Sequence, residues 1–318
     1  MSVTHPAVCL FSVGLTVFSA GIACAQDYPS KPIRVLTSAL GGSSDFAARQ
    51  IAQGITEGLG QPVIVDNRGN LSGEIGAKAP PDGYTIVLDS FSFWIAPLVQ
   101  AASYDPVRDF VAITLVGASP TIVVVHPSVP VTSIRELIAL AKAKPGTLNY
   151  ASSGTGSSQH LAVELFKSMA GINIVHVPYK GGAALVTAVI GNEVHLTFAS
   201  TAMATPHINS NRLRALAVTS AEPTALVPGL PTVAASGVPG YEFTSKVAMF
   251  APAKTPRDII NRLNRETVLF LSKPIAKERF FRNGSETFGS SPEELAASVT
   301  ADIAKWGKVI KDAGIRAE

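Results

Sequence analysis

Three short turns rich in glycine and hydroxyl side chains carry the residue types best suited to chemistry in this sequence. They occupy residues 41–45, 152–158 and 179–182, and each follows an apolar run and precedes residues at helical spacing. Such a turn leaves the first N–H groups of a helix unpaired beside its partial positive charge, an arrangement that binds carboxylates and phosphates. Each turn is therefore a candidate anion site.

The same turns have a structural interpretation, because Ser, Thr and Asp are the ordinary caps of helix starts. Asp45 fits that interpretation best, and we expect it to cap its own helix rather than contact an anion. A single turn would favour capping alone. Their recurrence along one chain leaves both interpretations open.

Signatures of catalysis are absent from the sequence. It contains no HExxH pair, no GxSxG elbow and no GxxxxGK[ST] loop. Gly154-Thr155-Gly156 lacks the third glycine of a dinucleotide fingerprint, and the acidic residues form no close pair after a strand. His176 and His195 fall in expected strands, where a structural role is the simpler interpretation. We expect no enzyme activity, no metal and no cofactor.

Length and composition are those of a globular protein with one or two domains. The chain has 318 residues, of which 47% are hydrophobic, and a formal net charge of +3. A charge this small argues against a surface that binds nucleic acid. A chain this apolar is not expected to be disordered.

The first 25 residues have the character of a cleaved signal peptide. They are uncharged at every side chain except His5, and Ala23-Cys24-Ala25 fits an A-x-A cleavage site. An uncleaved anchor or a lipoprotein signal is the alternative, but Gly21 is a poor match to the aliphatic residue that a lipoprotein signal needs. Cleavage after Ala25 removes both cysteines, Cys9 and Cys24.

Alternating strand-like and helix-like segments predict an α/β fold with two mostly parallel sheets flanked by helices. Two stretches have the character of crossings between lobes, at residues 121–130 and 228–252. We therefore expect a two-lobed molecule joined by two crossover strands, with residues 26–122 and 246–318 in the first lobe and 123–245 in the second. A ligand belongs between the lobes.

Ten segments of the sequence resemble the Bug family, the periplasmic receptors of tripartite tricarboxylate transporters. The matching segments run in order through the whole mature chain. They are residues 28–34, 41–45, 59–68, 81–85, 104–110, 150–154, 176–181, 213–219, 230–233 and 304–307. The resemblance implies a type II periplasmic-binding-protein fold and a monomer that captures a small organic acid. It also implies delivery to membrane permease subunits without chemistry on the ligand.

Carried over by position, the family's ligand loops fall on the three turns. The residues implied are Gly42, Ser43 and Ser44 in the first lobe, and Gly154, Thr155, Gly156, Ser157, Ser158, Tyr179, Gly181 and Ser200 in the second.

The sequence departs from the family pattern at several points. Residues 38–40 replace an aromatic-and-proline lead-in, and residues 69–80 are shorter than usual. Ala199-Ser200 stands where an Asp is frequent, which disfavours an amino-acid ligand. The segment with Phe91, Phe93 and Trp94 forms an aromatic loop that we expect in the core, with a wall for an apolar ligand as the alternative.

Two other functions fit the same fold. One is a ligand-sensing partner of a membrane sensor kinase. The other is a hydrolase that uses a serine among residues 152–158 with His160 as base, although no orienting carboxylate lies nearby in sequence.

Overall fold

The computed structural model describes residues 1–2, 28–38, 40–179 and 182–315, so residues 3–25 of the expected signal segment and Gly181 lie outside the described residues. The strands are β1 Ile33–Thr37, β2 Val63–Asn67, β3 Thr85–Ser90, β4 Phe110–Val125, β5 Asn149–Ser152, β6 Val175–Pro178, β7 Leu196–Ser200, β8 Arg214–Val218, β9 Thr244–Pro252 and β10 Glu286–Thr287. The helices are α1 Ser43–Leu59, the short 3-10 helix η1 Gly69–Leu71, α2 Ser72–Ala77, α3 Ser92–Val99, α4 Ile134–Ala143, α5 Ser158–Ala170, α6 Gly182–Ile190, α7 Thr201–Asn209, α8 Arg257–Ser272, α9 Pro274–Arg282 and α10 Pro292–Asp312. No described helix is both long and apolar enough to cross a bilayer.

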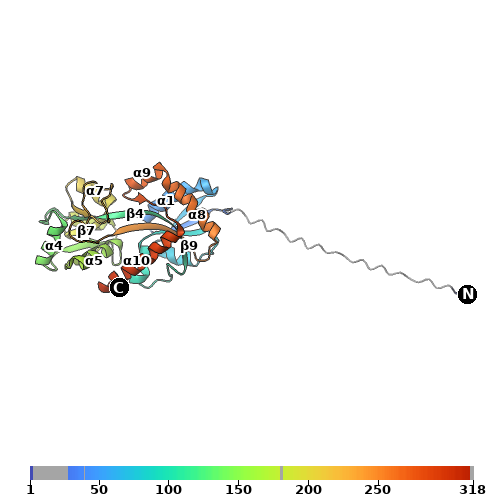
Figure 1. The fold of residues 1–318 in the computed structure, drawn as a ribbon, viewed down its shortest axis with the longest axis horizontal. Coiled ribbons are helices and arrows are strands. Elements are labelled where there is room, and N and C mark those ends of the chain that lie inside the picture. Colours follow the sequence, from blue (N-terminus) through green and yellow to red (C-terminus); the bar gives the residue numbers. More distant parts are fainter. Residues whose placement is uncertain (3–27, 39, 180–181, 316–318) are drawn as a thin grey trace.

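Strand β4 belongs to two sheets. Its residues 110–120 pair with β9 in the first sheet, and its residues 121–125 pair with β7 and β8 in the second. Figure 1 shows β4 and β9 crossing the centre of the molecule, with α1, α8 and α9 on one side and α4, α5 and α7 on the other. The expected α/β fold of two lobes joined by crossover strands is confirmed.

Strand direction explains where a ligand site forms. In the first sheet β1, β2, β3 and β4 run in one direction, and β9 and β10 run against them. In the second sheet β5, β6, β7 and β8 share a direction, and β4 opposes them. Because β4 leads from the first sheet into the second, the carboxyl ends of β1 and β3 point toward those of β5, β6 and β7. Ligands of α/β proteins bind at such ends.

The aromatic segment after β3 belongs to the core, as expected, although residues 92–99 form helix α3 and not a loop. Phe91 and Trp94 are at most 1% exposed, and the Phe91 ring packs edge-on against Trp94, Phe243 and Trp306. Phe93 is buried too, but it also borders the pocket described below.

Contacts outside the two strands also join the lobes. The Thr201 hydroxyl at the start of α7 donates to the Gly284 carbonyl, 2.9 Å away, between α9 and β10. Helix α10 packs against α3 of the first lobe and α5 of the second.

Candidate functional site

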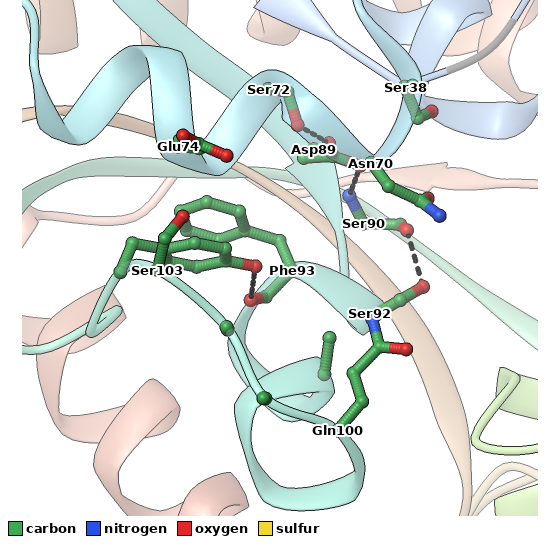
Figure 2. A pocket seen from close by; sticks show the side chains of 15 residues that line it. Ser38, Asn70, Ser72, Glu74, Asp89, Ser90, Ser92, Phe93, Gln100 and Ser103 are labelled. Atoms are coloured by element: carbon green, nitrogen blue, oxygen red, sulfur yellow. Dashed lines mark hydrogen bonds between the residues drawn. The ribbon is translucent and has the colours of Figure 1, made fainter. Parts of the chain in front are cut away.

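A pocket of about 290 Å³ opens at the carboxyl ends of β1 and β3 (Figure 2). Hydroxyl and amide side chains converge on it beside the rings of Phe93 and Tyr104. Its lining residues are Ser38, Gly69, Asn70, Ser72, Glu74, Asp89, Ser90, Ser92, Phe93, Ala96, Gln100, Ala101, Ala102, Ser103 and Tyr104. None of these described lining residues is Lys, Arg or His.

Asp89 is the buried acidic group of this pocket, with 6% of its surface exposed. Its Oδ1 accepts hydrogen bonds from the Ser90 backbone N–H at 2.7 Å and the Ser44 hydroxyl at 3.2 Å, and its Oδ2 accepts one from the Ser72 hydroxyl at 2.8 Å. Burial raises the pKa of Asp89, and hydrogen bonds from the Ser90 backbone and from the Ser72, Ser44 and Ser90 side chains act against that rise. Ser44, which the resemblance assigns to a ligand, thus directs its hydroxyl to a carboxyl group of the protein.

Gly41, Gly42 and Ser43 of the first turn are exposed, whereas Asp45 is buried. Gly42 is the N-cap of α1 and receives no side-chain cap, and Ser43 is exposed at the first position of the helix. Asp45 Oδ2 accepts from the Gly41 backbone N–H at 3.0 Å, and its Oδ1 faces Arg49 at 3.0 Å. Asp45 thus closes the turn that leads into α1 and pairs with Arg49, but it does not cap α1 as the sequence predicts, because the N-cap is Gly42 and no side chain caps it.

In the second turn, some hydroxyl groups are hydrogen-bonded within the protein and others are exposed to solvent. Ser157 is the N-cap of α5, and its hydroxyl accepts from the His160 backbone N–H at 3.3 Å. Thr155 is exposed, Ser158 is half-buried, and Gly154 and Gly156 have φ of +122° and +75°, a conformation that favours glycine. The described first turn of α5 holds no acidic residue.

The stacked imidazole rings of His160 and His176 lie against the second turn and form hydrogen bonds with it. The rings of His160 and His176 are 4.1 Å apart and nearly parallel. His160 Nδ1 accepts the Gly156 backbone N–H at 3.0 Å, and His176 Nε2 lies 2.6 Å from the Ser152 hydroxyl. Burial, and then the neighbouring His176, lower the pKa of His160 to about 4. As neutral rings, His160 therefore holds the Gly156 backbone and His176 holds the Ser152 side chain.

This arrangement bears directly on the hydrolase alternative. His160, the expected base, is occupied by the Gly156 backbone N–H. The serine that does meet an imidazole is Ser152, and it is 0% exposed, so a substrate cannot reach its hydroxyl. No three described His, Cys, Asp or Glu side chains lie together as a metal site would require.

The remaining expected residues lie at the facing ends of the second sheet. Tyr179 donates its backbone N–H to the Ser152 carbonyl at 2.9 Å, and its hydroxyl donates to Glu193 at 3.3 Å. Ser200 ends β7 opposite Thr121 of β4, where β4 passes between the sheets.

The second turn also approaches the pocket of the first lobe. A Cβ atom placed on Gly156 would lie 2.9 Å from Val99 Cγ1 at the end of α3. Ala96 and Gln100 of the same helix end line the pocket. The structure thus brings the second turn and the pocket together around α3.

Sequence reasoning missed most of the pocket wall. Asp89, Ser90 and Ser92 follow or end a buried strand, which is the pattern that singled out the three turns. The aromatic residues between them drew attention to the core instead. Ser38 and Asn70 occupy the matching positions after β1 and β2.

Comparison with known proteins identifies similar chains over nearly the full length. The family model described as "Tripartite tricarboxylate transporter family receptor" matches residues 47–315. Protein BugT of Bordetella pertussis is 33% identical over 96% of this chain and 97% of its own. The solved structure "R. palustris Rpa4515 with adipate" is 37% identical, with a TM-score of 0.81, over 91% of this chain and 99% of that chain. The periplasmic binding protein BugD is 31% identical, with a TM-score of 0.78, over 92% and 100%.

Proposed function

The chain belongs to the tripartite tricarboxylate transporter receptor family, as its resemblance to Bug proteins indicated, and we propose that it captures a small carboxylate-bearing solute for the membrane permease of such a transporter. Adipate in the R. palustris relative supports a carboxylate ligand. The observation that carries the proposal is that the carboxyl ends of β1 and β3 in the first sheet face those of β5 and β7 in the second. Turns that follow these strands can then contact one solute from both lobes.

In this proposal the exposed turns supply the binding groups. The N–H groups at the starts of α1 and α5, with the hydroxyls around them, receive the solute between the lobes. The proposed binding residues are Gly42, Ser43, Ser44, Gly154, Thr155, Gly156, Ser157, Ser158, Tyr179, Gly181 and Ser200. We place the boundaries between the lobes after residue 122 and after residue 245, and the two lobes with their binding residues close on the solute.

The protein in this proposal performs no chemistry on its ligand, acts as a monomer and reaches the periplasm after cleavage following Ala25. The buried position of Ser152 supports the first point, since its hydroxyl pairs with His176 out of reach of a substrate.

Two substitutions in the second turn test the site. A thermal-shift screen of mono-, di- and tricarboxylates supplies the probe, and calorimetry then measures its affinity. Thr155→Ala should weaken binding by about 1–3 kcal/mol through loss of a hydrogen bond to a charged group. Its melting temperature should stay unchanged, because Thr155 is exposed.

Ser157→Ala should weaken binding similarly and also cost about 1 kcal/mol of stability, because Ser157 caps α5. Ser133→Ala is the matched control: Ser133 caps α4 in the same way through the Glu136 backbone N–H. It should lose stability and keep its affinity. Unchanged affinity in both Thr155→Ala and Ser157→Ala would place the site elsewhere.

A further inference from the structure

The two facing ends of the site differ in charge. In the first lobe, the first turn of α1 contains Asp45, and Ser44 of the same turn donates to Asp89. In the second lobe, the first turns of α5 and α7 contain no acidic residue among those described. A ligand carboxylate at the start of α1 would meet two carboxyl groups, which offset the positive field of that helix. The start of α5 offers the same N–H groups without this repulsion.

The pocket in the first lobe is also rich in acceptors. Asp89 lies in its wall, Glu74 lies at its edge, and no basic side chain is among its described lining residues. The hydroxyls of Ser44 and Ser72 already donate to Asp89. Asp89 lines the pocket, and an ionised carboxylate only accepts hydrogen bonds, so a ligand group beside it must be a donor. A second carboxylate in this pocket would face the Asp89 and Glu74 carboxyl groups, with no basic side chain among the described lining residues to pair with it.

We propose that Asp89 is a specificity-determining residue that gives the site two unlike ends. The ligand carboxylate binds at the start of α5, and a hydrogen-bond donor at the other end of the ligand, an ammonium or a hydroxyl group, binds beside Asp89. The preferred solutes are therefore ω-amino or ω-hydroxy acids and not dicarboxylates. Asp89 in the first lobe would supply the acid for an ammonium group that Ala199-Ser200 in the second lobe lacks. This inference rests on the proposed function, since it assigns the second end of a carboxylate solute.

Calorimetry on the wild-type protein at about pH 7 tests the inference without any variant. The probes are 6-aminohexanoate, 6-hydroxyhexanoate, hexanoate and adipate, which share one carboxylate and one chain length. Succinate, 4-aminobutanoate and 4-hydroxybutanoate repeat the comparison for shorter solutes. We expect one donor-bearing acid to bind at least about tenfold more tightly than the diacid of equal length, as for a hydrogen bond to a charged group.

Asp89→Asn then isolates the carboxyl group, because the amide keeps one acceptor for Ser90 and Ser44 and removes the charge. The preference for the donor-bearing acid over the diacid should fall at least about tenfold in this variant. Glu293→Gln is the control. Glu293 lies outside the pocket lining, is 67% exposed and pairs with Arg257, so this substitution should change the ratio less than about twofold.

Each outcome decides between the inference and its premise. Tighter binding of the diacid to the wild-type protein, or an unchanged ratio in a folded Asp89→Asn protein, overturns the inference and leaves carboxylate capture standing. If Asp89→Asn does not fold, the wild-type ratio decides alone. Failure of the wild-type protein to bind any probe, or any acid of the wider carboxylate screen, overturns the proposed function itself.

Discussion

Replacing Trp94 with alanine should lower the free energy of unfolding by about 3–5 kcal/mol. The indole is 0% exposed and lies within 6 Å of the Phe91 and Phe250 rings, with centroid distances of 5.8 and 5.9 Å. Its Nε1 donates to Asp302 at 3.3 Å, so truncation also deprives that carboxylate of a donor. Urea unfolding of both proteins under identical conditions measures the difference.

Phe281→Ala is the control for this prediction, since Phe281 is 45% exposed and its truncation should change stability by no more than about 0.5 kcal/mol. The same pair of variants separates the two interpretations of the aromatic segment. A Trp94→Ala protein of wild-type stability that has lost affinity for its carboxylate probe would make this segment a ligand wall and not core.

Local patterns were enough to predict most strands and helices. The apolar run at residues 33–37 forms β1, which lies between β2 and β3, and Ser133 caps α4 as the Ser-x-x-Glu spacing of residues 133–136 predicts. The sequence does not predict helix α3, because its own residues are apolar on every face and Pro97 lies within it. A helix without a polar face shows no helical period in its hydrophobic pattern. The length of β4 was also missed, because only pairing with β9 extends it back to Phe110.

The site shows a different limit of sequence reasoning. Ser44, Thr155 and Ser157 lie in turns of similar composition, yet one contacts Asp89, one is exposed and one caps a helix. Local sequence cannot distinguish these roles, because a hydroxyl takes whichever partner the tertiary structure brings within reach. Asp89 escaped notice for the same reason: its burial arises from α1 and α2 packing over the end of β3.

Acid should destabilise the protein well above the pH at which carboxylates titrate. His160 has a pKa of about 4 in the folded state, because burial and then the neighbouring His176 disfavour its cation, against an ordinary value of 6.5. The unfolded chain therefore binds more protons between these values, and stability must fall as pH decreases through that window. Each pH unit removes up to about 1.4 kcal/mol for this group, and the loss levels off below about pH 4.

The groups that face His160 do not reverse the direction in which stability changes with pH. His176 stacks on it and has its own pKa lowered by burial, so it adds to the same slope. Glu164 lies 3.8 Å from His160 Nε2 and would stabilise a cation, but it already accepts from Lys167 and from the Tyr150 hydroxyl. Carboxyl groups such as Asp109, whose pKa Arg108 lowers from 3.8, contribute only at lower pH.

Denaturant unfolding at several values between about pH 5 and 6.5 measures this slope above the range of carboxyl groups whose pKa is lowered, such as Asp109. The slope should be shallower in His160→Asn, whose amide oxygen offers the Gly156 backbone N–H an acceptor that does not titrate. Ser133→Ala, which loses about 1 kcal/mol at every pH, should keep the full slope. A wild-type protein of constant stability across this window would show that the stacked imidazoles bind protons freely in the folded state. The second turn would then rest on a support that tolerates charge, and its geometry would not depend on neutral histidines.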